Sequence, residues 1–186
     1  MEDCFYNYLL KYADYQCVIE ILYLCRELKN PKIMANTYSQ IYHHYIFAVQ
    51  HRECLIQTEW KDELFKYMTG CITNHKCKML SIGGVADHVH ILTGMNPTVS
   101  CATLMADVKR SSTLWINEKF YRPRWFSWQE GYGVFSYARS AIPNVAKYIE
   151  NQVQHHKKRT FQEEYLKILK DFDVDYDERY IFHSVL

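Results

Sequence analysis

The sequence predicts an α+β domain with the element order βαββαβ, an antiparallel sheet and helices on one face, as in ferredoxin-like and RRM-like domains. One observation is that segments rich in β-branched and aromatic residues alternate with segments whose apolar residues recur every three or four positions. A second is that the order of these segments matches the split βαβ arrangement. The chain has 186 residues, 48% of them hydrophobic, which is enough for one domain with an ordinary core.

Three strands and one helix make up the first part of this domain. Residues 41–49 are rich in β-branched and aromatic side chains, which predicts a strand. Residues 58–76 carry one apolar face at helical spacing, and Thr58 is the expected N-cap of that helix. Two further strands, 77–83 and 88–94, are expected to be joined by a short turn.

A helix, a strand region and two additional helices follow. Residues 100–120 predict the second helix, and residues 125–137 predict a fourth strand region that glycines interrupt. Helices are then expected at 142–158, with a proline tolerated in the first turn, and at 160–172. These two helices come after the βαββαβ unit and are expected to be appended to it.

Residues 1–33 differ from the rest of the chain. Their apolar residues recur at helical spacing until Asn30 and Pro31, which predicts one amphipathic helix. The alternative is that Met34 is the natural start and that this stretch is upstream sequence fused to the domain. In either case the expected organisation is an N-terminal extension over 1–33 and one domain over 34–186.

Charge and cysteine content indicate the compartment in which the protein resides more clearly than its function. The 22 basic and 21 acidic residues give a net charge of +1, which neither supports nor excludes a nucleic-acid partner. Seven cysteines without a Cys-x-x-Cys pair argue against a disulfide framework and favour a reducing compartment. No apolar run approaches the ~20 residues that span a bilayer, and the first residues are acidic. We therefore expect a cytoplasmic protein without a membrane partner.

Two histidines on a predicted strand are the sharpest chemical feature. Residues i and i+2 of a strand point to the same face, so His88 and His90 project together while Val89 and Ile91 face the core. Two neighbouring imidazoles provide half of a divalent metal site. The alternative is a pair of polar residues on a solvated strand face.

A tyrosine and a glutamine form the second feature. Tyr148 and Gln152 are four residues apart in a predicted helix and therefore lie on one face. A phenol can act as a nucleophile, but its pKa of about 10 means that it needs activation, which a metal bound by a substrate phosphate would assist. The amide oxygen of Gln152 suits a hard cation. The alternative is a tyrosine at the core edge of an amphipathic helix.

Four stretches of the chain carry a family resemblance, and they are Asp87-His88-Val89-His90, Asp107-Val108-Lys109-Arg110-Ser111-Ser112, Phe126-Ser127-Trp128-Gln129-Glu130-Gly131-Tyr132-Gly133 and Tyr148-Ile149-Glu150-Asn151-Gln152-Val153-Gln154-His155-His156. In this order they resemble the small single-tyrosine HUH transposases of the insertion sequence 200/605 family, within the superfamily of REP-associated tyrosine transposases. The resemblance covers residues 37 to about 182.

The resemblance implies a specific chemistry and specific partners. His88, His90 and Gln152 would bind a divalent ion, usually Mg²⁺ with Mn²⁺ as an alternative. Tyr148 would be catalytic, attacking single-stranded DNA beside hairpins at the ends of an insertion sequence and forming a 5′-phosphotyrosine linkage with a free 3′-hydroxyl. Relatives act as homodimers in which the tyrosine helix of one subunit serves the His pair of the other.

Other polar residues are weaker candidates for DNA contacts, since a solvated helix face or a helix C-terminus explains them equally well. His155 and His156 follow Gln152 closely and could also lie near Tyr148. The candidate DNA-binding residues are Lys109, Arg110, Ser111, Ser112, Lys157 and Lys158.

Two other functions remain open at this point. A ferredoxin-like sheet rich in aromatic residues can bind single-stranded nucleic acid without chemistry, by stacking bases on the sheet. A domesticated HUH endonuclease with a host role would have the same chemistry without a mobile element.

Overall fold

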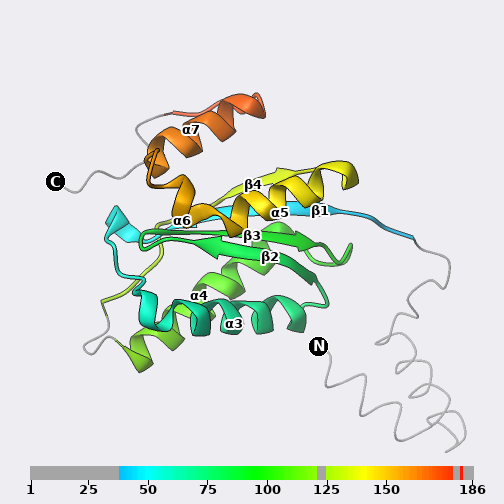
Figure 1. The fold of residues 1–186 in the computed structure, drawn as a ribbon. Coiled ribbons are helices and arrows are strands. Elements are labelled where there is room, and N and C mark those ends of the chain that lie inside the picture. The colour runs from blue at the N-terminus through cyan, green and yellow to red at the C-terminus, as the bar shows by residue number, and fades with distance from the viewer. Residues whose placement is uncertain (1–37, 121–124, 178–180, 182–186) are drawn as a thin grey trace, which may run out of the picture. The chain divides into compact units, whose positions relative to one another are not determined.

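The computed structural model describes residues 38–120, 125–177 and 181 of the chain (Figure 1). The helix predicted over 1–33 lies outside the described residues, so that prediction and the domain boundary at residue 34 stay untested. No helix of the described part is long and apolar enough to cross a membrane.

The sheet confirms the predicted topology. Its strands are β1 (Tyr42–Ala48), β2 (Lys78–Gly84), β3 (His88–Gly94) and β4 (Gly133–Ser136), in the order β2-β3-β1-β4. Every neighbouring pair is antiparallel. This is the strand order of a ferredoxin-like βαββαβ domain, because each helix of the unit connects two strands that are not neighbours in the sheet.

Helices α3 (Thr58–Asn74) and α4 (Cys101–Lys119) cover one face of the sheet (Figure 1). Alternate residues of β1 and β3 point into this layer, as the period of a strand requires. The main core joins these strand residues to the apolar faces of both helices, and it includes Tyr45, Phe47, Val89, Ile91, Leu64, Met68, Leu104 and Val108.

The opposite face is covered by α5 (Ile142–Glu150) and by α7 (Phe161–Asp171), with the short α6 (Gln152–His155) between them (Figure 1). Val145 and Ile149 of α5 pack against Leu92 of β3. Phe161 of α7 belongs to a separate cluster that contains Ile46 of β1. The helices of the βαββαβ unit thus lie on one face as predicted, and the appended helices bury the other.

Three predicted boundaries were wrong. The N-cap of α3 is Gln57, which makes no side-chain cap, and Thr58 is the first helical residue. The fourth strand is shorter than expected because Gly131 turns the chain with a φ of 77° ahead of β4. The predicted helix over 142–158 is interrupted at Asn151, which has a φ of −92° and a ψ of 16°; both its backbone N–H, at 3.1 Å, and its side-chain amide, at 2.9 Å, donate to the Lys147 carbonyl. The helix therefore ends before Gln152, and α6 begins there.

A glycine of β2 lets α5 lie close to the sheet. A Cβ on Gly83 would be 2.1 Å from the carbonyl oxygen of Ile149, which follows Tyr148 on α5. We expect Gly83→Ala to displace α5 and to lower the free energy of unfolding by about 1–3 kcal/mol, measured by urea denaturation. Gly70→Ala is the matched control, because a Cβ there meets nothing within 4 Å and a helical glycine is replaced by a better helix former. Equal stability of the Gly83 variant and the wild type would contradict this close packing.

Candidate metal and tyrosine site

The two histidines of β3 lie on the sheet face covered by the C-terminal helices. His88 pairs with Ala48 and His90 with Ile46, so both imidazoles point away from the main core. Both are fully buried, at 0% exposure. The solvated strand face considered as an alternative is therefore wrong.

A carboxylate of α7 lies between the histidines. The Oε2 atom of Glu164 is 2.8 Å from His156 Nε2, 3.7 Å from His90 Nε2 and 3.8 Å from His88 Nε2. The ligand atoms of these four residues all lie within 4.8 Å of one another. The Nε2 atom of His90 is buried without a hydrogen-bond partner. A buried, unpaired nitrogen beside a carboxylate fits a divalent cation.

Gln152 also reaches this cluster. Its Oε1 atom is 2.9 Å from His156 Nε2 and 3.4 Å from His88 Nε2, while its Nε2 donates to Glu164 Oε1 at 2.9 Å. The amide oxygen thus faces the same space as the imidazoles. The structure thus brings together His88, His90 and Gln152, the three residues that the family resemblance singles out.

The hydroxyl of Tyr148 donates a hydrogen bond to Glu164 Oε1. Its ring is perpendicular to that of His90, with 6.0 Å between centroids, and 5.2 Å from the ring of His155. Tyr148 and Gln152 belong to two helices, because the chain breaks at Asn151, yet both donate to Glu164. The same chain therefore supplies the tyrosine and the His pair.

Burial sets the charge of the cluster. It raises the pKa of Glu164 to about 8, helped by the Asp87 carboxylate, and so favours the protonated acid at neutral pH. It also lowers the pKa of His156 to about 4, of His44 to about 3 and of His90 well below its usual range. Neutral imidazoles keep a nitrogen lone pair available for a metal.

These shifts predict how the metal-free protein responds to pH. The carboxyl of Glu164 has a folded-state pKa above its unfolded value of 4.5, so its contribution to stability is lost as pH rises towards 8. Histidines with lowered pKa values act in the opposite direction, because the folded protein gains stability as pH rises through their unfolded pKa of 6.5. Glu164→Gln retains these histidines, so the comparison isolates the carboxyl: between pH 6.5 and 8 we expect the free energy of unfolding of the chelator-treated protein to fall by about 2 kcal/mol relative to that of Glu164→Gln. Denaturant melts of both proteins measure the difference, and parallel pH profiles would contradict the assignment.

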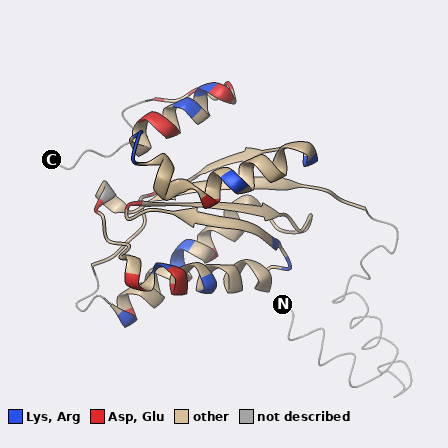
Figure 2. Cartoon of the chain, viewed as in Figure 1, with Lys and Arg blue, Asp and Glu red and all other residues tan. Residues whose placement is uncertain are grey.

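Two cavities adjoin the tyrosine. One, of about 360 Å³, is lined by Tyr148 and Glu164 together with Arg159 and with Lys167, which pairs with Asp171 in the same lining. The other, of about 330 Å³, is lined by Tyr148 with Lys157 and Lys158. The basic residues between α6 and α7 are visible in Figure 2. Cationic side chains around a nucleophile are suited to a phosphate backbone.

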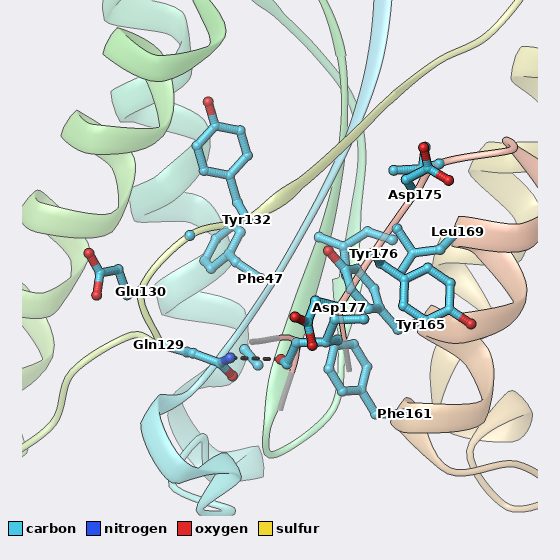
Figure 3. Close-up of a pocket in the computed structure, with 15 residues that line it drawn as sticks. Phe47, Gln129, Glu130, Tyr132, Phe161, Tyr165, Leu169, Asp175, Tyr176 and Asp177 are labelled. Atoms are coloured by element: carbon cyan, nitrogen blue, oxygen red, sulfur yellow. Dashed lines mark hydrogen bonds between the residues drawn. The ribbon is translucent and has the colours of Figure 1, made fainter. Parts of the chain in front are cut away.

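A third cavity, of about 300 Å³, lies between β1, the loop before β4 and α7 (Figure 3). Its described lining combines aromatic rings with carboxylates and contains no lysine or arginine: Phe47, Tyr132, Phe161, Tyr165, Tyr176, Glu130, Asp175 and Asp177 are among these residues. Such a lining does not neutralise phosphates. It meets the histidine cluster through Phe161, whose ring stacks on His88 with centroids 4.3 Å apart.

The candidate DNA contacts on α4 lie across the sheet from the His pair. Lys109 Nζ donates to the carbonyls of Gln129 and Gly131 at 2.7 and 2.5 Å and so holds the loop before β4. Ser112 is buried and accepts a hydrogen bond from Trp128 Nε1 at 2.9 Å. The side chain of Ser111 donates to Asp107. The remaining residue, Arg110, is exposed. Lys157 and Lys158, in contrast, lie next to Tyr148.

Glu164 and His44 were missed by the sequence reasoning. Glu164 shares a helix face with Phe161 and Ile168, and a carboxylate at a core-facing position was the signal that could have indicated it. His44 contacts His90 Nδ1 through its Nε2 at 2.9 Å. His44 lies two residues before Ile46 on the predicted strand, and Ile46 pairs with His90, so His44 is on the same face as the His pair.

Comparisons with known proteins identify the family of this chain. The family described as Transposase IS200 like matches residues 37–152. The transposases for insertion sequence element IS200 of Salmonella typhimurium and Salmonella typhi are each 26% identical over 132 residues, covering 68% of this chain and 86% of theirs. A crystal structure of a Deinococcus radiodurans R1 protein assigned as a transposase has a TM-score of 0.53 and 22% identity, covering 65% of this chain and 97% of that one, and shares the fold. The family match extends over more than half of the chain and ends at Gln152, the last residue of the predicted ion site, so this chain belongs to the IS200-like transposases.

Proposed function

We propose that this protein cleaves and rejoins single-stranded DNA at hairpin-bearing insertion-sequence ends, through a 5′-phosphotyrosine intermediate on Tyr148 and with a divalent metal. One observation carries the proposal. The Tyr148 hydroxyl and the buried His pair converge on the same carboxylate, Glu164, and Tyr148 also lines a cavity with Lys157 and Lys158. A tyrosine that only packed at the edge of a core would not require a buried carboxylate shared with two imidazoles.

The proposed reaction exchanges one phosphodiester for another. The Tyr148 oxygen attacks the scissile phosphorus, the 3′-oxygen of the upstream nucleotide leaves and takes a proton from water to become a free 3′-hydroxyl, and the 5′-phosphate stays on the tyrosine. Glu164 Oε1, which accepts the hydrogen bond of the phenol, is placed to take its proton when ionised. A metal at His88, His90 and Gln152 would withdraw charge from the phosphate and position it for in-line attack. Lys157, Lys158 and Arg159 would hold the flanking backbone.

The resemblance also motivates the assembly and setting that we propose. A homodimer in the cytoplasm, with Mg²⁺ or Mn²⁺ as the ion, is the expected form. Tyr148 lies beside His90 of its own chain, so an active site shared between subunits would require α5 and α6 to be exchanged between them. Light scattering tests the dimer, and a monomer at working concentration would count against it.

The non-catalytic binding module is less well supported. RNA-recognition modules stack bases on an open sheet face. Here α3 and α4 cover one face, and α5 and α7 cover the other. A domesticated endonuclease would share the chemistry, and terminal hairpins in the neighbouring DNA would distinguish it from a transposase.

A covalent-adduct assay tests the proposal. The protein is mixed with labelled single-stranded DNA from the element ends and separated on a denaturing gel. We expect a protein–DNA band with Mg²⁺ or Mn²⁺ and no band with chelator. Tight DNA binding in chelator, without a covalent band in either metal, would favour the binding module.

A further inference from the structure

The ion site contains two donors beyond those that the family resemblance assigns. We propose that His156 and Glu164 are ligands of the ion beside His88 and His90, and that this donor set selects a transition metal such as Mn²⁺, Co²⁺ or Zn²⁺ over Mg²⁺. The inference rests on the metal dependence proposed above and deepens it by naming the ligands and the class of ion.

The distances suit a single ion among these side chains. The Oε2 atom of Glu164 lies 2.8 to 3.8 Å from the Nε2 atoms of His88, His90 and His156. Ligand atoms about 2.1 Å from one metal ion are separated from each other by roughly 3 to 4 Å. All four donors lie within 4.8 Å of one another, so small side-chain shifts bring them to that range.

In the rings of His88, His90 and His156, the Nδ1 atom has a partner outside the site, and this leaves Nε2 directed towards Glu164. His88 Nδ1 is 2.7 Å from Asp87 Oδ1, His156 Nδ1 is 3.0 Å from the Arg159 carbonyl, and His90 Nδ1 is 2.9 Å from His44 Nε2. With Nδ1 as the donor in each pair, every Nε2 presents a lone pair to the Glu164 carboxylate. In the metal-free protein a proton on Glu164 satisfies one of these lone pairs and leaves the other two without a donor. A cation among the four ligand atoms satisfies all three lone pairs and keeps the carboxylate ionised, so the arrangement fits a bound metal.

The donor types decide which metal is favoured. Mg²⁺ prefers oxygen ligands and retains several waters, whereas imidazole suits the divalent transition metals. This site offers three imidazoles, one carboxylate and the amide oxygen of Gln152, all on largely buried side chains. Glu164 also accepts the hydrogen bond of Tyr148 through its other oxygen, so one carboxylate connects the ion to the nucleophile.

Visible absorption of bound Co²⁺ tests the ligand set without DNA. Co²⁺ is titrated into the metal-free 186-residue chain. We expect ligand-field bands that stoichiometric Zn²⁺ removes and millimolar Mg²⁺ does not. Glu164→Gln and His156→Ala should each weaken Co²⁺ binding by at least about tenfold and change the spectrum. His75→Ala is the control, because that imidazole contacts Asp107 on α4, across the sheet from the site. Thermal melts establish that each variant is folded.

The outcomes separate this inference from the proposed function. Wild-type affinity and spectrum in both folded variants would show that neither residue is a ligand and would overturn the inference, leaving the His88, His90 and Gln152 site intact. Displacement of Co²⁺ by millimolar Mg²⁺ would overturn the selectivity. If Co²⁺ binds as expected and no covalent adduct forms with DNA, the ligand set stands and the proposed reaction fails.

Discussion

We expect Tyr148→Phe to lower the rate of covalent protein–DNA adduct formation by more than about 10³-fold, because it removes the attacking oxygen. The ring that packs against His90 and His155 is kept, so the fold and the affinity for DNA should change little. Denaturing gels measure the adduct, and fluorescence anisotropy of labelled DNA measures binding.

Tyr67→Phe is the matched control for this substitution. Tyr67 stacks on Trp115 on the far side of the sheet, so loss of its hydroxyl should leave the adduct unchanged. If Tyr148→Phe formed the adduct at the wild-type rate, another residue would be the nucleophile. If it lost DNA binding as well, Tyr148 would be needed for binding, and the assay would not identify the attacking group.

The second large effect is expected from His88→Ala. The substitution removes one imidazole of the cluster together with its Asp87 contact, so ion affinity should fall by about 10²-fold or more. Adduct formation at low metal concentration should be lost with it. Isothermal titration with Mn²⁺ measures the affinity, and added metal should partly restore the adduct.

A histidine on the opposite side of the sheet provides the control for His88→Ala. His75→Ala also removes an imidazole, but one that contacts Asp107 on α4, and it should leave Mn²⁺ affinity unchanged. His88 stacks on Phe161, so a thermal melt must show that His88→Ala is folded. A folded His88 variant that binds Mn²⁺ as tightly as the wild type would remove His88 from the ion site.

The topology of the sheet, and the sheet face on which His88 and His90 lie, could be predicted because both follow from local periodicity. Alternation along β3 places Val89 and Ile91 in one core and the two histidines on the other face, whatever surrounds them. The strand order follows from the βαββαβ order of elements. What periodicity could not show was that a second helical layer covers the histidines.

The remaining errors depend on contacts between distant segments. Glu164 reaches the histidines only because α7 packs on β1 through Phe161 and its neighbours, a contact that no local pattern encodes. The break at Asn151, where ψ is 16°, falls within a sequence pattern that is otherwise typical of one long helix. Ser112 was a candidate for contacts to DNA phosphates, but its hydroxyl is buried and accepts a hydrogen bond from Trp128 Nε1.

Peptide mapping of the adduct tests the central claim most directly. The trapped protein–DNA complex is digested with trypsin and nuclease and analysed by mass spectrometry. Cleavage after Lys147 and Lys157 releases residues 148–157, which contain no other tyrosine. We predict that this peptide carries the nucleotide remnant as a 5′-phosphate ester on Tyr148. A remnant on any other residue, or linkage through a 3′-phosphate, would contradict the account.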